Sequence, residues 1–520
     1  MAPDLARGRH SGLFVPLFSI PSSDSWGIGE ILDIPILARW LREAGQDLLQ
    51  ILPVNEMAPG QKSPYSAITA MAIDPLFISL RGVAEFLAAG GEQALGGEAR
   101  DTLRDVRASK IVEHDRIRRI KQEACRLAFA RFERGSAAAP ALDAWVREQA
   151  WWLDDYAVFR ALHAAFDERP WTTWPDDVKS CDAAGVERAR RELAGEIRFH
   201  QYLQWIADRQ WQQARKDAGV ALVGDLPFMV DLDSADVWAH QDLFDLDASV
   251  GVPPDAFSET GQNWGLPVYR WDTKTGGVDG WLRARARRSA ALYDGYRIDH
   301  LVGFYRTYVI PQDGGKRRFC PADEASQEAQ GERVMALFRE EGPHIIAEDL
   351  GTVPDFVRAS LTRVGVPGHR VFRWEREWHH PEQPFRDPRN YPALSVATSG
   401  THDTEPAAVW WEQAPADERR KVAALPDLEP VFGEHDVQEM PFTPALRDAL
   451  LEILVASGSD LLILPIQDVF GWRDRINVPA KVDHENWTWR LPWPVDAIDA
   501  QPAARERAAR LRAWCRVHRR

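Results

Sequence analysis

The 520-residue chain has few cysteines, no excess of positive charge and no long apolar run. Its four cysteines stand far apart, and no C-x-x-C pair or histidine spacing indicates a zinc site: Cys125, Cys181, Cys320 and Cys515. We therefore expect free thiols in a reducing compartment, and a cytoplasmic protein. The 63 lysines and arginines against 78 aspartates and glutamates give a formal charge of −15, which disfavours nucleic acid and anionic membranes as partners.

No stretch of the chain is long and apolar enough for a transmembrane helix. Near the N-terminus, Arg7 and Arg9 precede an apolar stretch from Leu13 to Ile20 that superficially resembles part of a signal peptide. Pro16 interrupts this stretch, and no small-x-small cleavage site follows it. We expect neither a secretion signal nor a membrane anchor.

The chain also lacks internal repeats, Gly/Ser linkers and low-complexity tracts. Hydrophobic residues make up 45% of it and charged residues 27%, which is typical of a packed globular protein and leaves room for a sizeable core. Because nothing marks a domain boundary, we predict one continuous catalytic domain over residues 1–520.

Seven short apolar runs end abruptly in polar or charged residues, and helix-like segments follow them. The runs cover residues 48–54, 220–225, 295–299, 344–348, 369–374, 394–398 and 460–465. Buried parallel strands of an α/β protein have this pattern, so we predict a (β/α)8 TIM barrel. After the fourth run, Thr352 is predicted as the N-cap of a helix over 356–364.

The first and second runs are much further apart than an ordinary barrel crossover allows, and the residues between them are charged and helix-periodic. We therefore predict an inserted helical subdomain at about 76–218. Two further insertions, predicted as loops, lie at about 240–285 and 405–450.

Three acidic residues follow apolar runs directly or closely: Asp299, Glu348 and Asp403. In a barrel, the C-terminal ends of the strands share one face, which holds the active site of nearly every characterised barrel enzyme. For a single acid in such a position, helix capping or a salt bridge is as good an explanation as catalysis. Three together favour a catalytic site.

Arg297 and Asp299 stand two apart on a strand, so their side chains project to the same face. An adjacent guanidinium favours an ionised carboxylate, which suits a nucleophile. Apolar residues precede Glu348, and their desolvating effect suits a general acid. Such a pair is what glycosidic bond cleavage needs. A Mg²⁺ site and an inert salt-bridge cluster are the alternatives for acids in this spacing.

Tryptophan is abundant, with 22 residues, and many fall in predicted loops beside polar residues, as Trp264 does in Gly261-Gln-Asn-Trp-Gly265. Aromatic faces pack on the apolar faces of sugar rings, while neighbouring amides and acids bind the hydroxyls. Core packing accounts for most tryptophans in any protein, but a few are enough for sugar subsites.

Motifs for other chemistry are missing or incomplete. The nearest approach to a calcium loop, Asp231-Leu-Asp-Ser-Ala-Asp236, lacks the glycine and distal glutamate of an EF-hand. No phosphate-binding glycine loop and no Gly-x-Ser-x-Gly elbow occurs. We assign no metal and no cofactor.

Ordered motifs along nearly the whole chain resemble those of one family, the 4-α-glucanotransferases called amylomaltases or disproportionating enzymes, of the α-amylase clan. The motifs are Gly27-Ile-Gly29, Gln50-Ile-Leu-Pro53, Ser63-Pro-Tyr65, Gly224-Asp-Leu-Pro227, Asp233-Ser-Ala-Asp-Val-Trp-Ala239, Gly251-Val-Pro-Pro-Asp-Ala-Phe-Ser258, Gly261-Gln-Asn-Trp-Gly265, Arg297-Ile-Asp-His300, Ala347-Glu-Asp-Leu-Gly351, Gly400-Thr-His-Asp403 and Arg475-Ile-Asn-Val-Pro479.

The resemblance implies a retaining transferase that moves an α-1,4-glucan segment from a maltooligosaccharide, starch or glycogen donor to the 4-hydroxyl of glucose or another glucan. It implies that Asp299 is the nucleophile, Glu348 the acid/base and Asp403 the residue that stabilises the transition state. It further implies six substrate-binding residues. Arg297 and His402 support the sugar at the cleavage point, Tyr65 and Asp225 line it, and Trp264 and Asn477 shape the acceptor side.

The chain departs from the family pattern at Ser66, at Thr404-Glu405-Pro406 and at Ala480. Donor length and acceptor preference therefore stay open. Two alternative functions also stay open: a retaining α-glucan hydrolase, which needs the same three acids, and a catalytically silent glycan-binding protein.

Overall fold

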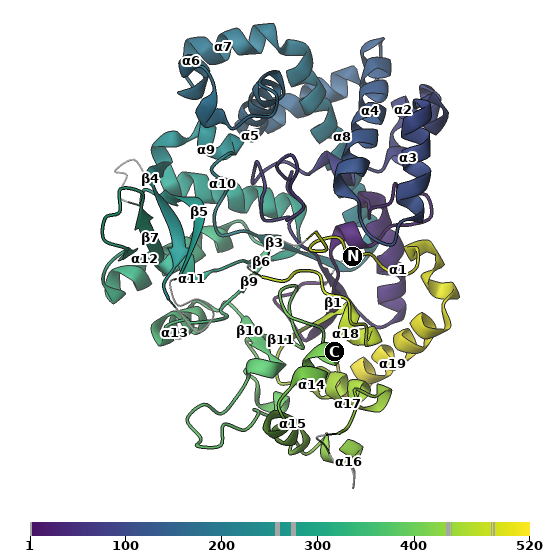
Figure 1. Cartoon of the computed structure of the whole chain (residues 1–520), viewed down its shortest axis with the longest axis vertical. Helices are drawn as coiled ribbons and strands as arrows, with labels where there is room; N and C mark the ends of the chain where they lie inside the picture. The colour runs from purple at the N-terminus through teal and green to yellow at the C-terminus, as the bar shows by residue number, and fades with distance from the viewer. Residues whose placement is uncertain are drawn as a thin grey trace.

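The computed structural model describes residues 3–254, 261–271, 277–432, 437, 439–479, 481 and 484–520. Eight parallel strands form a closed barrel in the order β1-β12-β11-β10-β9-β6-β3-β2 (Figure 1). They are β1 (His10–Phe14), β2 (Leu48–Gln50), β3 (Ala221–Leu226), β6 (Gly295–Ile298), β9 (His344–Ala347), β10 (Gly368–Val371), β11 (Ser395–Thr398) and β12 (Leu461–Pro465). The predicted (β/α)8 fold is confirmed.

All seven predicted apolar runs overlap barrel strands, and the eighth strand, β1, was not among them. Strand β1 overlaps the start of the apolar stretch that resembled a signal peptide. It closes the barrel by pairing with β12 on one side and β2 on the other. Gly12 of β1 makes this closure sterically feasible, because a Cβ at this position would lie 2.2 Å from the carbonyl oxygen of Leu48.

The barrel strands are buried along nearly their whole length, since side chains fill the interior and helices cover the outside. Helix α1 (Ile34–Glu43) shows how the covering works. Its buried residues Leu37, Trp40 and Leu41 recur at helical spacing, so one face of the helix packs on the core.

Helices fill the chain between β2 and β3 and lie together in the upper part of the view (Figure 1). They are α2 (Ala84–Ala88), α3 (Gly97–Ala108), α4 (His114–Glu133), α5 (Ala139–Ala165), α6 (Asp176–Lys179), α7 (Ala183–Glu192) and α8 (Ala194–Ala218). Helix α5 packs on α8 and on α9 (Ala235–Ala239). That residues 76–218 form a separate inserted subdomain stays a prediction.

A second sheet lies beside the barrel, with the strand order β5-β4-β7-β8 and antiparallel pairing (Figure 1). Its strands are β4 (Phe244–Val252), β5 (Gln262–Tyr269), β7 (Thr307–Pro311) and β8 (Arg318–Cys320). Strands β4 and β5 fall within the segment predicted as a loop insertion at 240–285, and α10 (Gly277–Leu292) begins there too. This sheet carries Trp264 toward the barrel mouth.

The remaining helices cover the second half of the barrel. They are α11 (Val302–Tyr305), α12 (Glu324–Glu340), α13 (Asp355–Val364), α14 (Ala407–Gln413), α15 (Ala416–Ala423), α16 (Glu429–Phe432), α17 (Pro444–Val455), α18 (Ile466–Phe470) and α19 (Pro502–His518). Helix α13 begins one residue before the predicted helix, but Thr352 is not its cap. Pro354 occupies that position and makes no side-chain cap bond, because its ring carries no hydrogen-bond acceptor.

In the described part of the chain, no helix combines the length and apolar character that crossing a membrane requires. Each of the four cysteines lies within the described residues and none is in a disulfide; Cys125 and Cys515 are buried.

Candidate active site

The carboxylates predicted from strand ends converge at one end of the barrel. Asp225 is the second-to-last residue of β3, Asp299 follows β6, Glu348 follows β9 and Asp403 lies five residues after β11. Because all eight strands are parallel, these positions meet on the same face.

Arg297 of β6 is the central cation of this face and is only 6% exposed. Its Nη1 contacts both carboxylate oxygens of Asp225, at 2.9 and 2.7 Å. Its Nη2 lies 2.8 Å from Oδ1 of Asp299. Burial raises the pKa of Asp225 to about 7, against the opposing effect of Arg297. One guanidinium thus holds two carboxylates side by side in a poorly solvated site.

Glu348 lies deep in the same face and receives a 2.8 Å hydrogen bond from the backbone N–H of His300 to its Oε2. Burial raises the pKa of Glu348 to about 8, and the charge of Asp299 raises it further while Arg297 lowers it. The carboxyl group therefore carries a proton at neutral pH. His300 holds a left-handed backbone conformation with φ of 43°, which turns its N–H away from β6 toward Glu348.

Asp403 is held from two sides. Nδ2 of Asn477 donates a 2.7 Å hydrogen bond to its Oδ1, and Nη2 of Arg475 donates to its backbone oxygen at 2.9 Å. Nε2 of His402 lies 3.4 Å from the same carboxylate oxygen. Burial lowers the pKa of His402, so its imidazole is neutral at pH 7. The Asp403 side chain remains 45% exposed, so it is open to a ligand.

Aromatic rings form one wall of the site. Tyr65 stacks on His402 with ring centroids 5.3 Å apart and an angle of 24°, and Trp487 packs against both rings at 5.9 and 5.8 Å. The Tyr65 hydroxyl donates to Oδ2 of Asp225 at 2.8 Å. Trp264 meets the ring of His300 edge-on at 4.8 Å, on the side of the second sheet.

The Tyr65 hydroxyl is protonated. Burial raises the pKa of Tyr65 well above its usual value, and the charges of Asp225, Asp299 and Asp403 raise it further, while Arg297 lowers it. The hydroxyl therefore donates to Asp225, and it accepts a hydrogen bond from Nη1 of Arg297 at 3.5 Å.

The structure brings together all nine site residues named from the sequence, and adds others. Trp487 and Arg373 were not singled out: Trp487 stands in no distinctive motif, and Arg373 is buried beneath the site, where it contacts Glu405. Ala480 and residues 255–258 of one family motif lie outside the described residues. Among the described residues, no three His, Cys, Asp or Glu side chains gather as a metal site requires.

Comparisons with known proteins agree with this geometry. The family model described as 4-alpha-glucanotransferase matches residues 15–496. The 4-alpha-glucanotransferase of Thermus thermophilus is 34% identical over 506 residues, covering 93% of this chain and 95% of the relative. That of Chlamydia muridarum is 30% identical over 511 residues, covering 94% and 92%.

Among solved structures, the amylomaltase from Streptococcus agalactiae in complex with acarbose superposes with a TM-score of 0.82 at 25% identity. The match covers 98% of this chain and 99% of that one. Fold, family model and relatives agree along nearly the whole length, so this chain belongs to the 4-alpha-glucanotransferase family.

Proposed function

We propose that this member of the family transfers α-1,4-glucan segments by double displacement, with Asp299 as the nucleophile and Glu348 as the acid/base. The observation that carries the assignment is the contrast between the two groups. Glu348 keeps a proton because burial raises its pKa to about 8, while Asp299 forms an ion pair with the Arg297 guanidinium at 2.8 Å.

In the first step, Glu348 gives its proton to the glycosidic oxygen of the donor, and Asp299 attacks the anomeric carbon. The reducing-end fragment departs, and the remaining glucan is bound to Asp299. In the second step, Glu348 removes the proton from the 4-hydroxyl of an acceptor sugar, which attacks the same carbon. Two inversions restore the α configuration.

Asp403 takes the role of binding sugar hydroxyls more tightly in the transition state than in the ground state. Support comes from its fixed position: Asn477 and Arg475 hold its side chain and backbone, yet the carboxylate is partly exposed. Tyr65, His402 and Trp264 provide ring faces around the cleavage point.

Transfer requires that a bound acceptor sugar react in preference to water, whose concentration is about 55 M. A well-positioned acceptor can do so, because positioned groups reach effective molarities of about 10⁵ M or more. The Trp264 and Asn477 sides of the site are where we place the acceptor. The substrates proposed are maltooligosaccharides and longer α-1,4-glucans, with glucose as an acceptor. We place the activity in the cytoplasm, which the lack of a disulfide among the described cysteines favours.

The test is to incubate the purified chain with maltotriose alone and separate the products by length. Glucose together with a ladder of longer maltooligosaccharides is the expected result. Shorter sugars alone would indicate a hydrolase, and no change with any donor length would indicate a silent binding protein. Asp299→Asn and Glu348→Gln are each expected to lower turnover by at least about 10²-fold.

A further inference from the structure

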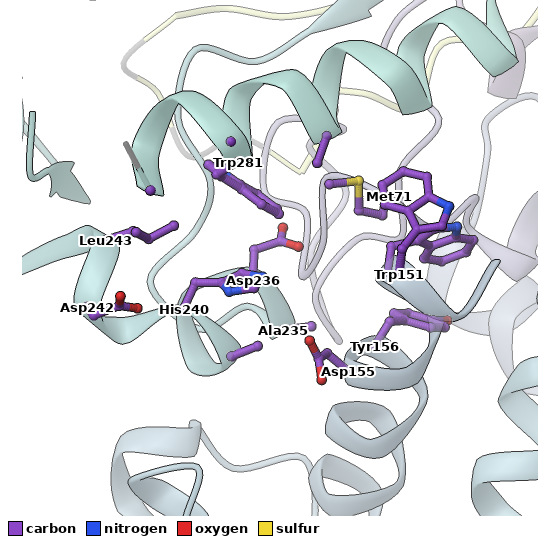
Figure 2. Close-up of a pocket in the computed structure, with 15 residues that line it drawn as sticks. Met71, Trp151, Asp155, Tyr156, Ala235, Asp236, His240, Asp242, Leu243 and Trp281 are labelled. Carbon is purple, nitrogen blue, oxygen red and sulfur yellow. The ribbon is translucent and has the colours of Figure 1, made fainter. Parts of the chain in front are cut away.

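A second cavity lies between helices α5, α9 and α10, outside the site described above (Figure 2). Its volume is about 340 Å³, near the lower end of the range of about 300–1,000 Å³ for small-ligand pockets. None of the three carboxylates assigned to the reaction lines it. The cavity runs from exposed Asp242 and Gly280 to buried Trp152 and Tyr156.

Three indole rings line this cavity, and one of them has no cation from the described residues against its face. The guanidinium carbons of Arg287 and Arg288 lie 4.8 Å from the ring centroids of Trp151 and Trp152. Trp281 of α10 instead meets the imidazole of His240, at 5.2 Å between centroids. Figure 2 shows Trp281 reaching down from α10 toward Asp236 and His240. Trp281 therefore provides an apolar ring surface beside polar groups.

Five polar side chains of the cavity are without hydrogen-bond partners in the part of the chain that the structure describes. They are the carboxylates of Asp155, on α5, and Asp242, the imidazole of His240, and the indole N–H groups of Trp151 and Trp281. The charges of Asp155 and Asp242 raise the pKa of His240. Burial is the larger influence and lowers that pKa, so the imidazole is neutral at pH 7, with one donor and one acceptor.

Asp236 also lines the cavity, but its oxygens are already engaged. Oδ2 accepts a 2.6 Å hydrogen bond from the backbone N–H of Ala70, and Oδ1 accepts one of 3.4 Å from the Thr69 hydroxyl. These bonds tie α9 to the loop that carries Tyr65. The Asp155 carboxylate and the His240 imidazole, in contrast, remain available to a ligand.

This combination selects among ligand classes. The Asp155 carboxylate opposes an anion. A simple cation would use Asp155 but leave the His240 N–H without an acceptor. A sugar ring satisfies both, because each hydroxyl donates and accepts and its apolar face packs on indole. We propose that this cavity is an accessory site for a glucosyl unit, separate from the catalytic one; the choice of glucose chemistry rests on the proposed function.

Calorimetric titration with maltose tests the proposal, in the full chain carrying Glu348→Gln to suppress turnover. Gly280 gives a matched pair of added substitutions, since it is exposed and a Cβ there meets no atom within 4 Å. Gly280→Trp fills the mouth of the cavity, and Gly280→Ala does not. We expect one bound maltose fewer per chain with Gly280→Trp than with Gly280→Ala.

Asp155→Asn provides a second variant that leaves the cavity open. It is expected to weaken the accessory binding step by at least about tenfold, because a hydrogen bond to a charged acceptor is lost. Equal maltose stoichiometry in the Gly280→Trp and Gly280→Ala chains would overturn the proposal. A second outcome would also overturn it: tetramethylammonium binds the Gly280→Ala chain but not the Gly280→Trp chain, and maltose shows no binding step at this cavity. That result would assign the cavity to cations.

The proposed function is tested separately from this site. With Glu348 intact, the Gly280→Trp chain is expected to transfer glucan from maltotriose at the rate of the unchanged chain. Absence of transfer in the unchanged chain contradicts the proposed function. Normal transfer with unaltered maltose stoichiometry contradicts only the accessory site.

Discussion

The side-chain amide of Asn477 donates a hydrogen bond from Nδ2 to Oδ1 of Asp403, with 2.7 Å between the two atoms. The residues are 74 positions apart, and the bond links the loop after α18 to the loop after β11. It fixes the orientation of a carboxylate that is otherwise 45% exposed. Asn477 therefore positions Asp403 as well as shaping the site.

Asn477→Ala is expected to lower kcat/KM for maltotriose disproportionation by about 10- to 100-fold, since hydrogen bonds to charged groups contribute about 1.5–3 kcal/mol. Steady-state kinetics on the purified variant measure this. Asn390→Ala is the control, because that residue is exposed and outside the site. Equal kcat/KM in the two variants would contradict a positioning role for Asn477.

Tyr65→Phe is expected to move the acid limb of the kcat/KM profile to higher pH. The Tyr65 hydroxyl bonds Oδ2 of Asp225 at 2.8 Å and lowers the pKa of that carboxyl, which burial has raised to about 7. Without the hydroxyl, the pKa of Asp225 rises and its ion pair with Arg297 is lost at a higher pH. Tyr308→Phe, in the second sheet, is the control, and an unshifted acid limb in Tyr65→Phe would refute this account.

The fold was largely predictable because seven barrel strands are short apolar runs that end in polar residues. Strand β1 was missed because its five residues run into the apolar stretch around Pro16, and only pairing with β2 and β12 gives it its place. Such pairing joins residues hundreds of positions apart, as His10 and Leu461 are, and no local pattern encodes it.

The convergence of the acids was predictable for a related reason. Parallel strands all end on one face of the barrel, so an acid at the C-terminal end of a strand lies on that face. The groups that hold those acids were not predictable. The contact of Asn477 with Asp403, and the packing of Trp487 on Tyr65 and His402, join loops whose conformations depend on the whole barrel. The family resemblance identified Asn477 as a site residue, whereas no feature of the sequence identified Trp487 as one.

The pH dependence of glycosyl transfer follows from Glu348. Because the carboxyl must be protonated for the first step and burial raises its pKa to about 8, kcat/KM is expected to fall as pH rises through about 8. Glu348→Gln is expected to lose this basic limb. A donor whose leaving group needs no proton, α-maltosyl fluoride, should restore the first step in that variant. No restoration would indicate that Glu348 is not the proton donor.

Three buried acids are expected to make a contribution to stability that falls between pH 5 and 8. The folded chain raises the pKa of Asp225 and Asp236 to about 7 and that of Glu348 to about 8, whereas the unfolded chain releases these protons near pH 4. These acids thus bind protons on folding in this window, so their contribution to the free energy of unfolding declines as pH rises through the folded pKa values. Histidines oppose the decline below about pH 6.5, because burial lowers the pKa of His114, His300 and His369 to about 4.

Urea unfolding at pH 5 and pH 8 measures this decline. Glu348→Gln is expected to reduce it, because the amide has no proton to lose, while exposed Glu382→Gln should leave it unchanged. Identical pH dependence in Glu348→Gln and the unchanged chain would contradict a buried, protonated Glu348.

The departure at Glu405 gives the last prediction. Glu405 accepts from Nη1 of Arg373 at 2.6 Å, and its other oxygen lies 3.6 Å from Nη1 of Arg475, whose Nη2 holds the backbone oxygen of Asp403 at 2.9 Å. Glu405→Ala is expected to lower kcat by about tenfold with little change in KM, because Arg475 loses its anchor while the substrate contacts remain.

Glu405→Asp keeps the charge, so it is expected to recover part of the lost kcat, and Glu405→Gln is expected to recover less. This order distinguishes charge anchoring from side-chain volume, because Gln fills the space of Glu better than Asp does. Recovery by Gln and not by Asp would show that Glu405 supports the Asp403 loop through packing, and that its ion pairs with Arg373 and Arg475 do not set the position of Asp403.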